Sequence, residues 1–265
     1  MRSNRMTVAD LRAAKGKRVL SMLYVETLDE AAAASAAGVD VLSIVAPVWT
    51  PEMREAAGDC FVQVGLLYGE LVTAKDYLKA AFSARKIGGD AYYCSASLDT
   101  VHRMASEGLP VVGHVGLVPS KATWTGGFRA VGKTADSALK VWQDMCALER
   151  AGAIAVELEV VPAAVGAELS KRSSLVTFGM GAGSGTDAQY LFSEDVLGCT
   201  RGHKPRHAKT YRNFRLEYDR LQAERIAAFG EFVADVKSGA YPGAEHDVPM
   251  NDDEMSRLIS MLDRA

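Results

Sequence analysis

Short apolar or β-branched runs alternate with longer segments of helical periodicity along most of this chain. Apolar runs of about four to eight residues are typical of strands, and apolar residues that recur every three to four positions are typical of helices. Strands that alternate with helices pair in parallel, because the helix carries the chain back to the start of the next strand. The pattern therefore predicts an α/β fold built on a parallel sheet.

Eight such runs can be read as strands. In chain order they are Val19–Tyr24, Val39–Val45, Phe61–Leu66, Ala91–Cys94, Pro110–His114, Ala153–Val160, Leu175–Gly179 and Asp195–Leu197. Eight strands with intervening helices predict a (β/α)₈ TIM barrel, which a chain of 265 residues is long enough to form. No linker rich in Pro, Gly and Ser divides the chain, so we expect one domain over residues 1–265.

The predicted helices carry recognisable starts and stops. They cover a short N-terminal helix from Thr7, then Asp29–Ala37, Ala74–Ile87, Leu98–Ser106, Ala135–Ala151, Ala163–Lys171, Asn213–Ser238 and Asn251–Ala265. Thr7 is a suitable N-cap with Asp10 three residues later, and several helices end at a glycine. The last predicted helix places Met255, Leu258 and Ile259 on one face, which suggests docking of this C-terminal helical tail on the barrel or on a neighbouring subunit.

Composition narrows the class of partner and the location. The net charge is −3 with a pI near 6.0, and no basic run is dense enough to indicate nucleic-acid binding. No apolar run has membrane-spanning length, and the N-terminus lacks the apolar core of a signal peptide. The four cysteines are scattered and form no metal-spaced pair. We therefore expect a cytoplasmic protein that acts on a small molecule, without nucleic-acid or membrane partners.

Chemistry-bearing residues follow the predicted strands where a TIM barrel carries its active site, at the carboxyl ends. His114 ends the fifth strand, and Glu157 and Glu159 end the sixth on one face of it. A carboxylate inside a barrel is costly to desolvate, so proton abstraction, a metal or a cationic partner must account for it. Simple pairing with a basic side chain at the rim explains the two glutamates about equally well.

Two further segments are less specific. The glycine-rich run Gly179–Gly185 follows the seventh strand and could bring backbone N–H groups to an anionic ligand, although such loops are also common in tight turns. The segment His203–Lys209 carries five ionisable side chains around Pro205. It could clamp a carboxylate or phosphate, or it could be an ordinary solvated loop.

Five motifs in this order resemble a known family. They are Val112–Pro119 with Gly126–Arg129, Leu158–Pro162, Gly179–Gly183 with Thr186-Asp187, Pro205–Lys209, and Ser238–His246. Together they resemble ketopantoate hydroxymethyltransferase, also called 3-methyl-2-oxobutanoate hydroxymethyltransferase, a family linked to pantothenate biosynthesis. The resemblance implies a barrel of the phosphoenolpyruvate mutase/isocitrate lyase type and a homo-oligomer, often a decamer.

The resemblance also implies roles for particular residues. The family uses Mg²⁺ to hold a 2-oxo acid as its enolate, which attacks the one-carbon unit of methylenetetrahydrofolate. Glu159 falls on the family's general base, which removes the proton beside the keto group. His114 matches a histidine at the family's substrate pocket. Both are expected to be catalytic.

The N-terminal half departs from the family at the metal site. The family's Gly-Asp-Ser falls on Val45-Ala46-Pro47, so Ala46 replaces one metal aspartate, and Gly65 replaces a second. The family's Lys-x-Glu falls on Tyr93-Cys94-Ser95. Magnesium prefers carboxylates and water as ligands, which alanine and glycine cannot supply. Glu26, Asp40 or Glu70 could replace one ligand but not all of them, so we predict no metal site, and the cofactor is left open.

The same departures suggest a changed substrate. Without a Lewis acid, the developing enolate needs hydrogen-bond donors, for which His114, Tyr93 and the Arg206 cluster are candidates. Aromatic residues near the mouth, including Trp49, hint at a more apolar or aromatic substrate, although each alone is better explained by packing. The predicted substrate-binding residues are Tyr93, Ser95, Tyr24, Tyr68, Gly181 and Arg206.

Three functions fit these expectations. The favoured one is a hydroxymethyltransferase-like enzyme that makes or breaks a carbon–carbon bond by aldol or retro-aldol chemistry, with hydroxymethyl transfer or formaldehyde release, on a substrate other than the usual 2-oxo acid. The second is ordinary ketopantoate synthesis with relocated metal ligands. The third is a catalytically retired paralogue that binds a ligand through the old pocket.

Overall fold

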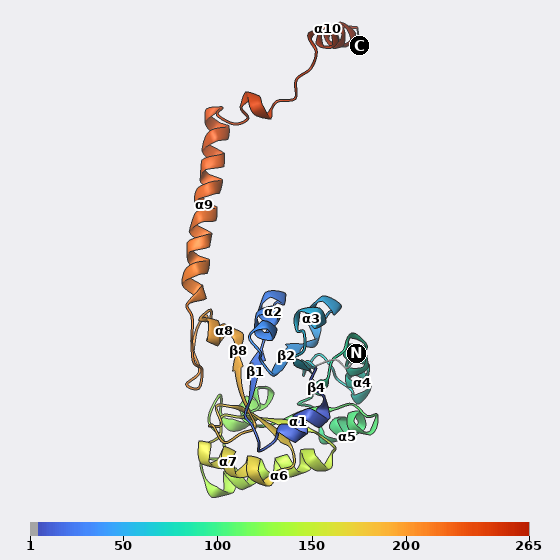
Figure 1. Ribbon diagram of the computed structural model, residues 1–265, viewed down its shortest axis with the longest axis vertical. Coiled ribbons are helices and arrows are strands. Elements are labelled where there is room, and N and C mark those ends of the chain that lie inside the picture. The colour runs from blue at the N-terminus through green and yellow to red at the C-terminus, as the bar shows by residue number, and fades with distance from the viewer. Residues whose placement is uncertain (1–4, 265) are drawn as a thin grey trace. The chain divides into compact units, whose positions relative to one another are not determined.

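A computed structural model describes residues 5–264 of the chain, and in it eight parallel strands close into a barrel in sequence order (Figure 1). The strands are β1 (Leu20–Tyr24), β2 (Val41–Val45), β3 (Phe61–Gly65), β4 (Ala91–Tyr93), β5 (Val111–Gly116), β6 (Ala155–Glu159), β7 (Val176–Met180) and β8 (Ala188–Phe192). The predicted (β/α)₈ fold is confirmed.

Helices connect most of the strands, and their ends follow local sequence chemistry. They are α1 (Val8–Ala14), α2 (Leu28–Ala36), α3 (Pro51–Ala56), α4 (Ala74–Ile87), α5 (Leu98–Ser106), α6 (Ala135–Arg150), α7 (Ala163–Arg172) and α8 (Ser193–Leu197), with short 3₁₀ turns at Ala46–Val48 and Pro119–Thr125. Thr7 and Asp10 form the predicted capping box. Thr73 and Asp76 form another on α4, which ends at Gly88 in the left-handed region.

Two apolar layers hold the barrel together. Residues on the outer face of the strands, such as Ile44 and Val64, are fully buried against the surrounding helices. Inside the barrel, Phe61, Val112 and Phe178 fill the lower part, where Leu11 of α1 packs against them. Because inward and outward side chains alternate along each strand, every strand contributes side chains to both layers.

Polar side chains occupy the upper interior. Ser43, Gln63, His114, Glu157 and Glu159 are all buried, and they come from four of the strands between β2 and β6. On the same strands, apolar inward residues lie nearer the amino end. Phe61 lies two positions before Gln63, and Val112 lies two positions before His114. The interior therefore changes from apolar to polar toward the carboxyl ends of the strands, where this fold carries its sites.

One strand prediction is wrong. Residues 195–197 lie in α8, and the eighth strand is Ala188–Phe192. No helix separates it from β7; residues 181–187 alone lead back to its start. An extended chain advances about 3.3 Å per residue, so seven residues span roughly 23 Å, enough to return along a five-residue strand. The prediction required a helical crossover, and this connection has none.

A buried ion pair anchors that connection at the amino ends of the strands. Asp187 accepts a hydrogen bond from Lys15 Nζ at 2.7 Å. It also accepts from the Thr177 N–H and hydroxyl, both at 2.8 Å, and from Ser170 Oγ at 3.2 Å. Burial alone would raise the pKa of Asp187, but the Lys15 ammonium and the Thr177 donors hold this pKa below its usual value. The anion is therefore stabilised where the N-terminal segment meets β7 and β8.

The chain divides into two compact units, the barrel unit Met1–Arg212 and the C-terminal unit Asn213–Ala265. The C-terminal unit contains α9 (Phe214–Ser238), a 3₁₀ turn (Ala244–His246) and α10 (Asp252–Leu262). Asn213 caps α9 through the Leu216 N–H, as expected for the predicted helix start. The single domain over residues 1–265 and the docking of the tail stay predictions.

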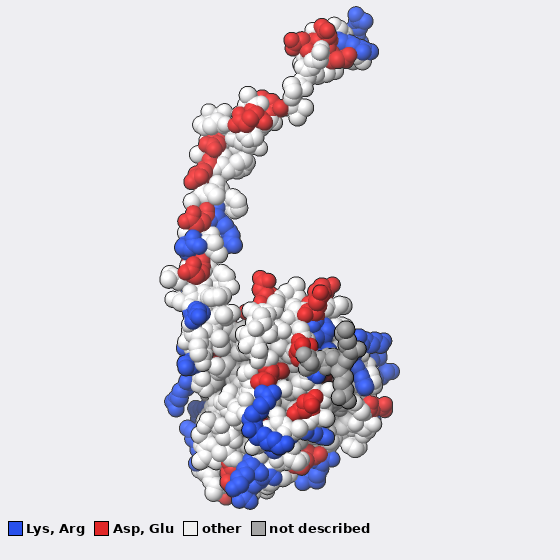
Figure 2. Space-filling model, viewed as in Figure 1, with Lys and Arg blue, Asp and Glu red and all other residues white. Residues whose placement is uncertain are grey.

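The charged residues of the barrel unit are mixed in sign on the face shown in Figure 2. Several charged residues of the barrel unit form ion pairs with a residue one turn away on the same helix. Lys140 Nζ, for example, lies 2.8 Å from Asp144 Oδ1. Among the helices of residues 5–264, none is both long enough and apolar enough to span a lipid bilayer.

Candidate active site

Strand register brings His114 and the two glutamates together. On the β5–β6 pair, His114 lies opposite Glu157, and Gly116 lies opposite Glu159. All three side chains point into the barrel, which confirms the predicted inward direction of the carboxylates. An imidazole and two carboxylates thus share the upper interior, where water is largely excluded.

The imidazole of His114 lies between three oxygen atoms. Its Nδ1 is 2.7 Å from the Tyr93 hydroxyl and 3.5 Å from Glu157 Oε2. Its Nε2 is 3.0 Å from Glu159 Oε2, but this oxygen lies off the direction of a ring N–H, so the contact is not a directed hydrogen bond. Nε2 therefore has no hydrogen-bond partner among the described residues, although it is buried.

Glu157 lies deepest and is held from the opposite side of the barrel. Its Oε1 accepts a hydrogen bond from Gln63 Nε2 at 2.7 Å, and the same nitrogen lies 3.2 Å from Ser43 Oγ. Burial raises the pKa of Glu157, while His114 and the Gln63 amide oppose the rise. Burial and the Glu157 charge raise the pKa of Tyr93, so this phenol keeps its proton over the physiological range.

An inner cavity of about 370 Å³ opens above these groups. Its floor and sides carry the polar groups Ser43, Tyr93, His114, Glu157 and Glu159. Aromatic rings also line it: those of Tyr24 and Phe192 lie 4.9 Å apart and those of Tyr190 and Phe192 lie 5.8 Å apart. The lining thus combines polar and aromatic groups, which suits an amphipathic small molecule.

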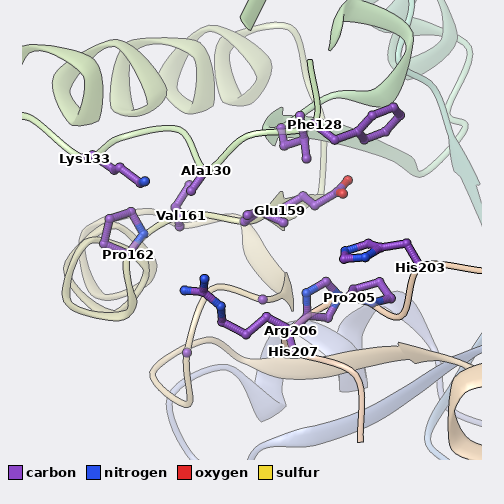
Figure 3. Close-up of a pocket in the computed structure, with 14 residues that line it drawn as sticks. Phe128, Ala130, Lys133, Glu159, Val161, Pro162, His203, Pro205, Arg206 and His207 are labelled. Carbon is purple, nitrogen blue, oxygen red and sulfur yellow. The ribbon is translucent and has the colours of Figure 1, made fainter. Parts of the chain in front are cut away.

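An outer cavity of about 680 Å³ adjoins the inner one, and Glu159 and Phe128 line both. Figure 3 shows the Glu159 carboxylate at one end of the outer cavity and the head groups of Lys133 and Arg206 toward the other. Gly181 lines its floor in the left-handed region, where a side chain would meet His207. The glycine of the predicted loop therefore permits close contact between this loop and His207.

A third cavity of about 200 Å³ contains the remaining predicted residues. Tyr68 and Ser95 line it, together with Tyr93, Val45 and Gly65, which it shares with the inner cavity. Tyr68 is 53% exposed, so it lies at the rim. The structure thus places every predicted site residue on one of three adjoining cavities, and their roles stay predictions.

Sequence reasoning missed several polar and aromatic groups of the site. These are Ser43, Gln63, Tyr190, Phe192 and Asp195, the last of which sits at the inner cavity although it was assigned to a strand. The available signal was a single polar residue inside an otherwise apolar strand, as Gln63 is within β3. Such a residue in a buried strand must find an internal partner, and Gln63 finds Glu157.

The residues at the positions of the family's metal ligands do not suit magnesium. The resemblance places metal aspartates at Ala46 and Gly65, which have no side-chain oxygen, and Ser95 replaces a carboxylate. Of the three proposed replacements, Asp40 precedes β2 at the amino ends and accepts hydrogen bonds from Ser21 and Arg18. Within residues 5–264 no group of three His, Cys, Asp or Glu side chains is arranged to hold a metal ion. We derive no step through a metal.

Replacing Gly116 by alanine should disturb the site through the backbone. Gly116 adopts φ of +86°, and an added Cβ would collide with the Glu159 carbonyl oxygen. We expect Gly116→Ala to lower the free energy of unfolding by about 2–4 kcal/mol, because overpacking adds to the strain of a left-handed residue. Gly108→Ala is the matched control, since Gly108 has φ of +73° with open space around it. Urea unfolding measures both, and equal losses would contradict the collision.

Glu157 should make stability depend on pH. Its folded pKa is raised, so the native state binds this proton more tightly than the unfolded state does. Stability from this group is therefore present below an unfolded pKa of about 4.3 and falls as the pH rises toward the folded pKa. We expect Glu157→Gln to remove that fall, so the variant gains stability relative to the wild type as the pH rises above about 4.3.

Unfolding in urea at several pH values tests this expectation. The control is Glu168→Gln, because Glu168 is an exposed partner of Arg172 on α7. If the stability of the wild type and of Glu157→Gln depended on pH in the same way, the pKa of Glu157 would not be raised in the folded state.

A sequence model described as ketopantoate hydroxymethyltransferase matches residues 70–244. The 3-methyl-2-oxobutanoate hydroxymethyltransferase of Thermus thermophilus is 35% identical, over 91% of this chain and 99% of that protein. The enzyme of the same name from Deinococcus radiodurans is 32% identical, over 85% of this chain and 86% of that protein.

Solved structures support the fold class. A 2,3-dimethylmalate lyase, described as a PEP mutase/isocitrate lyase superfamily member, superimposes with a TM-score of 0.52 at 13% identity, covering 97% of this chain and 96% of that chain. At this identity the likeness concerns the fold alone, and it agrees with the predicted barrel type. The sequence model and the two relatives show the family: the chain belongs to the ketopantoate hydroxymethyltransferase family.

Proposed function

We propose that this enzyme makes or breaks a carbon–carbon bond by aldol or retro-aldol transfer of a hydroxymethyl group, with Glu159 as the base and His114 as the donor to the enolate. Family membership supports carbon–carbon bond chemistry of the hydroxymethyltransferase type. The observation that carries the proposal is the buried Nε2 of His114, which lacks a hydrogen-bond partner beside Glu159 at the cavity. A buried donor without a partner is costly, and a ligand oxygen would satisfy it.

The position of the ring proton on His114 depends on Tyr93. We assign the Tyr93 hydroxyl, which keeps its proton because its pKa is raised, as the donor to Nδ1 of His114. In this assignment the ring N–H is at Nε2, the atom next to Glu159. Tyr93, in the position of a family lysine, would therefore act by fixing the tautomer of His114.

The reaction can be written with these groups alone. In the aldol direction Glu159 removes a proton from the carbon next to the 2-oxo group, and the electron pair moves onto the keto oxygen, which accepts from His114 Nε2–H. The enolate carbon then attacks formaldehyde, and the new hydroxymethyl oxygen takes the proton that Glu159 had removed. In the cleavage direction Glu159 takes the proton of the hydroxymethyl O–H, the carbon–carbon bond breaks, formaldehyde leaves, and Glu159 returns the same proton to the enolate carbon.

The walls suggest the kind of substrate. Tyr24, Tyr190 and Phe192 line the inner cavity together with the polar groups, so a 2-oxo acid with an apolar or aromatic side chain would suit it. Arg206 and Gly181 border the outer cavity and would contact the rest of the ligand. We further propose that the protein binds a small molecule, is cytoplasmic and forms a homo-oligomer. We expect it to have no nucleic-acid or membrane partner.

Turnover assays distinguish this proposal from the alternatives. The chain is incubated with 4-hydroxy-2-oxo acids bearing methyl or phenyl substituents at C3, and formaldehyde is measured with EDTA present. We expect release, faster for the phenyl compound. Turnover only of 3-methyl-2-oxobutanoate with methylenetetrahydrofolate and Mg²⁺ would instead favour ordinary ketopantoate synthesis. Ligand binding without turnover in any assay would favour a retired enzyme.

A further inference from the structure

The outer cavity has an unusual balance of charge. Lys133, His203, Arg206 and His207 line it, and Glu159 is the one carboxylate among its lining residues. Neither Lys133 nor Arg206 forms an ion pair or a hydrogen bond with another described residue. In contrast, Lys15 at the amino end of the barrel is bonded to Asp187, and Arg18 there is bonded to Asp40. Within residues 5–264, Lys133 and Arg206 thus have no ion-pair partner.

These cations come from separate parts of the chain and face one end of the cavity. Lys133 follows the loop after the 3₁₀ turn Pro119–Thr125, and Arg206 lies in the segment after α8. Figure 3 shows both head groups at the end of the cavity away from the Glu159 carboxylate. Two cations from different loops at one end of a 680 Å³ cavity provide two independent charge-assisted contacts for one anionic group.

The start of α7 adds to the positive potential at this end. The helix begins after Pro162, no side chain caps it, and Val161 and Pro162 line the cavity. The free N–H groups of a first helical turn favour nearby negative charge. This contribution is secondary, and the two unpaired side chains carry the argument.

We propose that the outer cavity binds a dianionic group of the substrate, a phosphate monoester or a pair of carboxylates, through Lys133 and Arg206. The proposal rests on the proposed function only in placing the reacting carbon of the same ligand beside Glu159, the residue common to both cavities. A small 2-oxo acid would occupy only the inner cavity. A ligand that also reaches Lys133 and Arg206 is longer and carries its second charged group away from the keto carbon.

Calorimetric titration of the full chain with simple anions tests the proposal without any turnover. The probes are inorganic phosphate, malonate and acetate at about pH 8 and constant ionic strength, because salt screens exposed charges. We expect phosphate or malonate to bind at least about tenfold more tightly than acetate, since two cations favour two negative charges. Tighter phosphate binding would identify a phosphate ester as the group, and tighter malonate binding a dicarboxylate.

Variants assign the binding to the two residues. Lys133→Gln and Arg206→Gln should each weaken dianion binding roughly tenfold, because each removes a charge-assisted contact. Lys209→Gln is the matched control, as Lys209 lies in the same segment but contacts the ring of Tyr211. Glu159→Gln should leave dianion binding intact while it stops turnover, so failure of this inference and failure of the proposed reaction give different results. The proposal would be overturned if the wild type bound no dianion, or if Lys133→Gln and Arg206→Gln each bound dianions as tightly as the wild type does.

Discussion

Glu159→Gln is expected to abolish proton exchange at the carbon next to the keto group of a bound 2-oxo acid. The side chain lies at the junction of the inner and outer cavities, with Oε2 3.0 Å from His114 Nε2. The amide retains the shape of the carboxylate but cannot accept a proton. General-base catalysis contributes about 10²- to 10⁴-fold, so the exchange rate should fall by that factor.

Proton NMR in deuterium oxide measures this exchange directly, with phenylpyruvate or 3-methyl-2-oxobutanoate as probe. No one-carbon donor is needed, because exchange reports on enolate formation alone. Glu168→Gln on the exposed face of α7 is the control and should exchange at the wild-type rate. If Glu159→Gln retains exchange within about threefold of the wild type, another group is the base.

Asp187→Ala is expected to cause the largest loss of stability. The substitution removes the acceptor for Lys15, Thr177 and Ser170 at a buried position. Removing one partner of a buried ion pair costs about 3–5 kcal/mol, because the other charge is left uncompensated. Lys15 retains partial exposure, with its side chain 19% accessible, so we expect the lower end of this range.

Acid should reproduce part of this loss in the wild type. Since the folded pKa of Asp187 is lowered, its stabilising contribution is complete above an unfolded pKa of about 3.9 and is lost as the pH falls through the folded pKa. Urea unfolding at neutral pH and in acid measures both effects. Asp99→Ala is the control, because its pair with Arg103 is exposed and contributes about 0–1 kcal/mol. A loss below about 1 kcal/mol for Asp187→Ala would mean that the network does not stabilise the fold.

Much of the fold can be predicted from local sequence chemistry. Helices Ala74–Ile87 and Leu98–Ser106 have the predicted bounds, because a threonine or serine cap and a following glycine mark their ends. The eighth strand is missed for a topological reason. The prediction relied on helices between strands, and residues 181–187 connect β7 to β8 without one.

The site is predictable in part. The rule that barrel sites lie at the carboxyl ends of strands identified His114 and Glu159 as candidate site residues, and the structure places their side chains 3.0 Å apart. Contacts across the barrel could not be predicted from the sequence. The approach of Gln63 to Glu157 joins β3 to β6, and it depends on barrel closure and strand register, which no local pattern specifies. The unpartnered Nε2 of His114 is likewise visible only in three dimensions.

The central claim is that Glu159 and His114 form the enolate without the metal that the family resemblance implies. The most direct test is the deuterium exchange rate of the wild type on a bound 2-oxo acid, with excess EDTA and then with added Mg²⁺. The arrangement of donors predicts equal rates under both conditions, because Ala46 and Gly65 offer no metal ligand. Exchange that requires Mg²⁺ and stops in EDTA would contradict it.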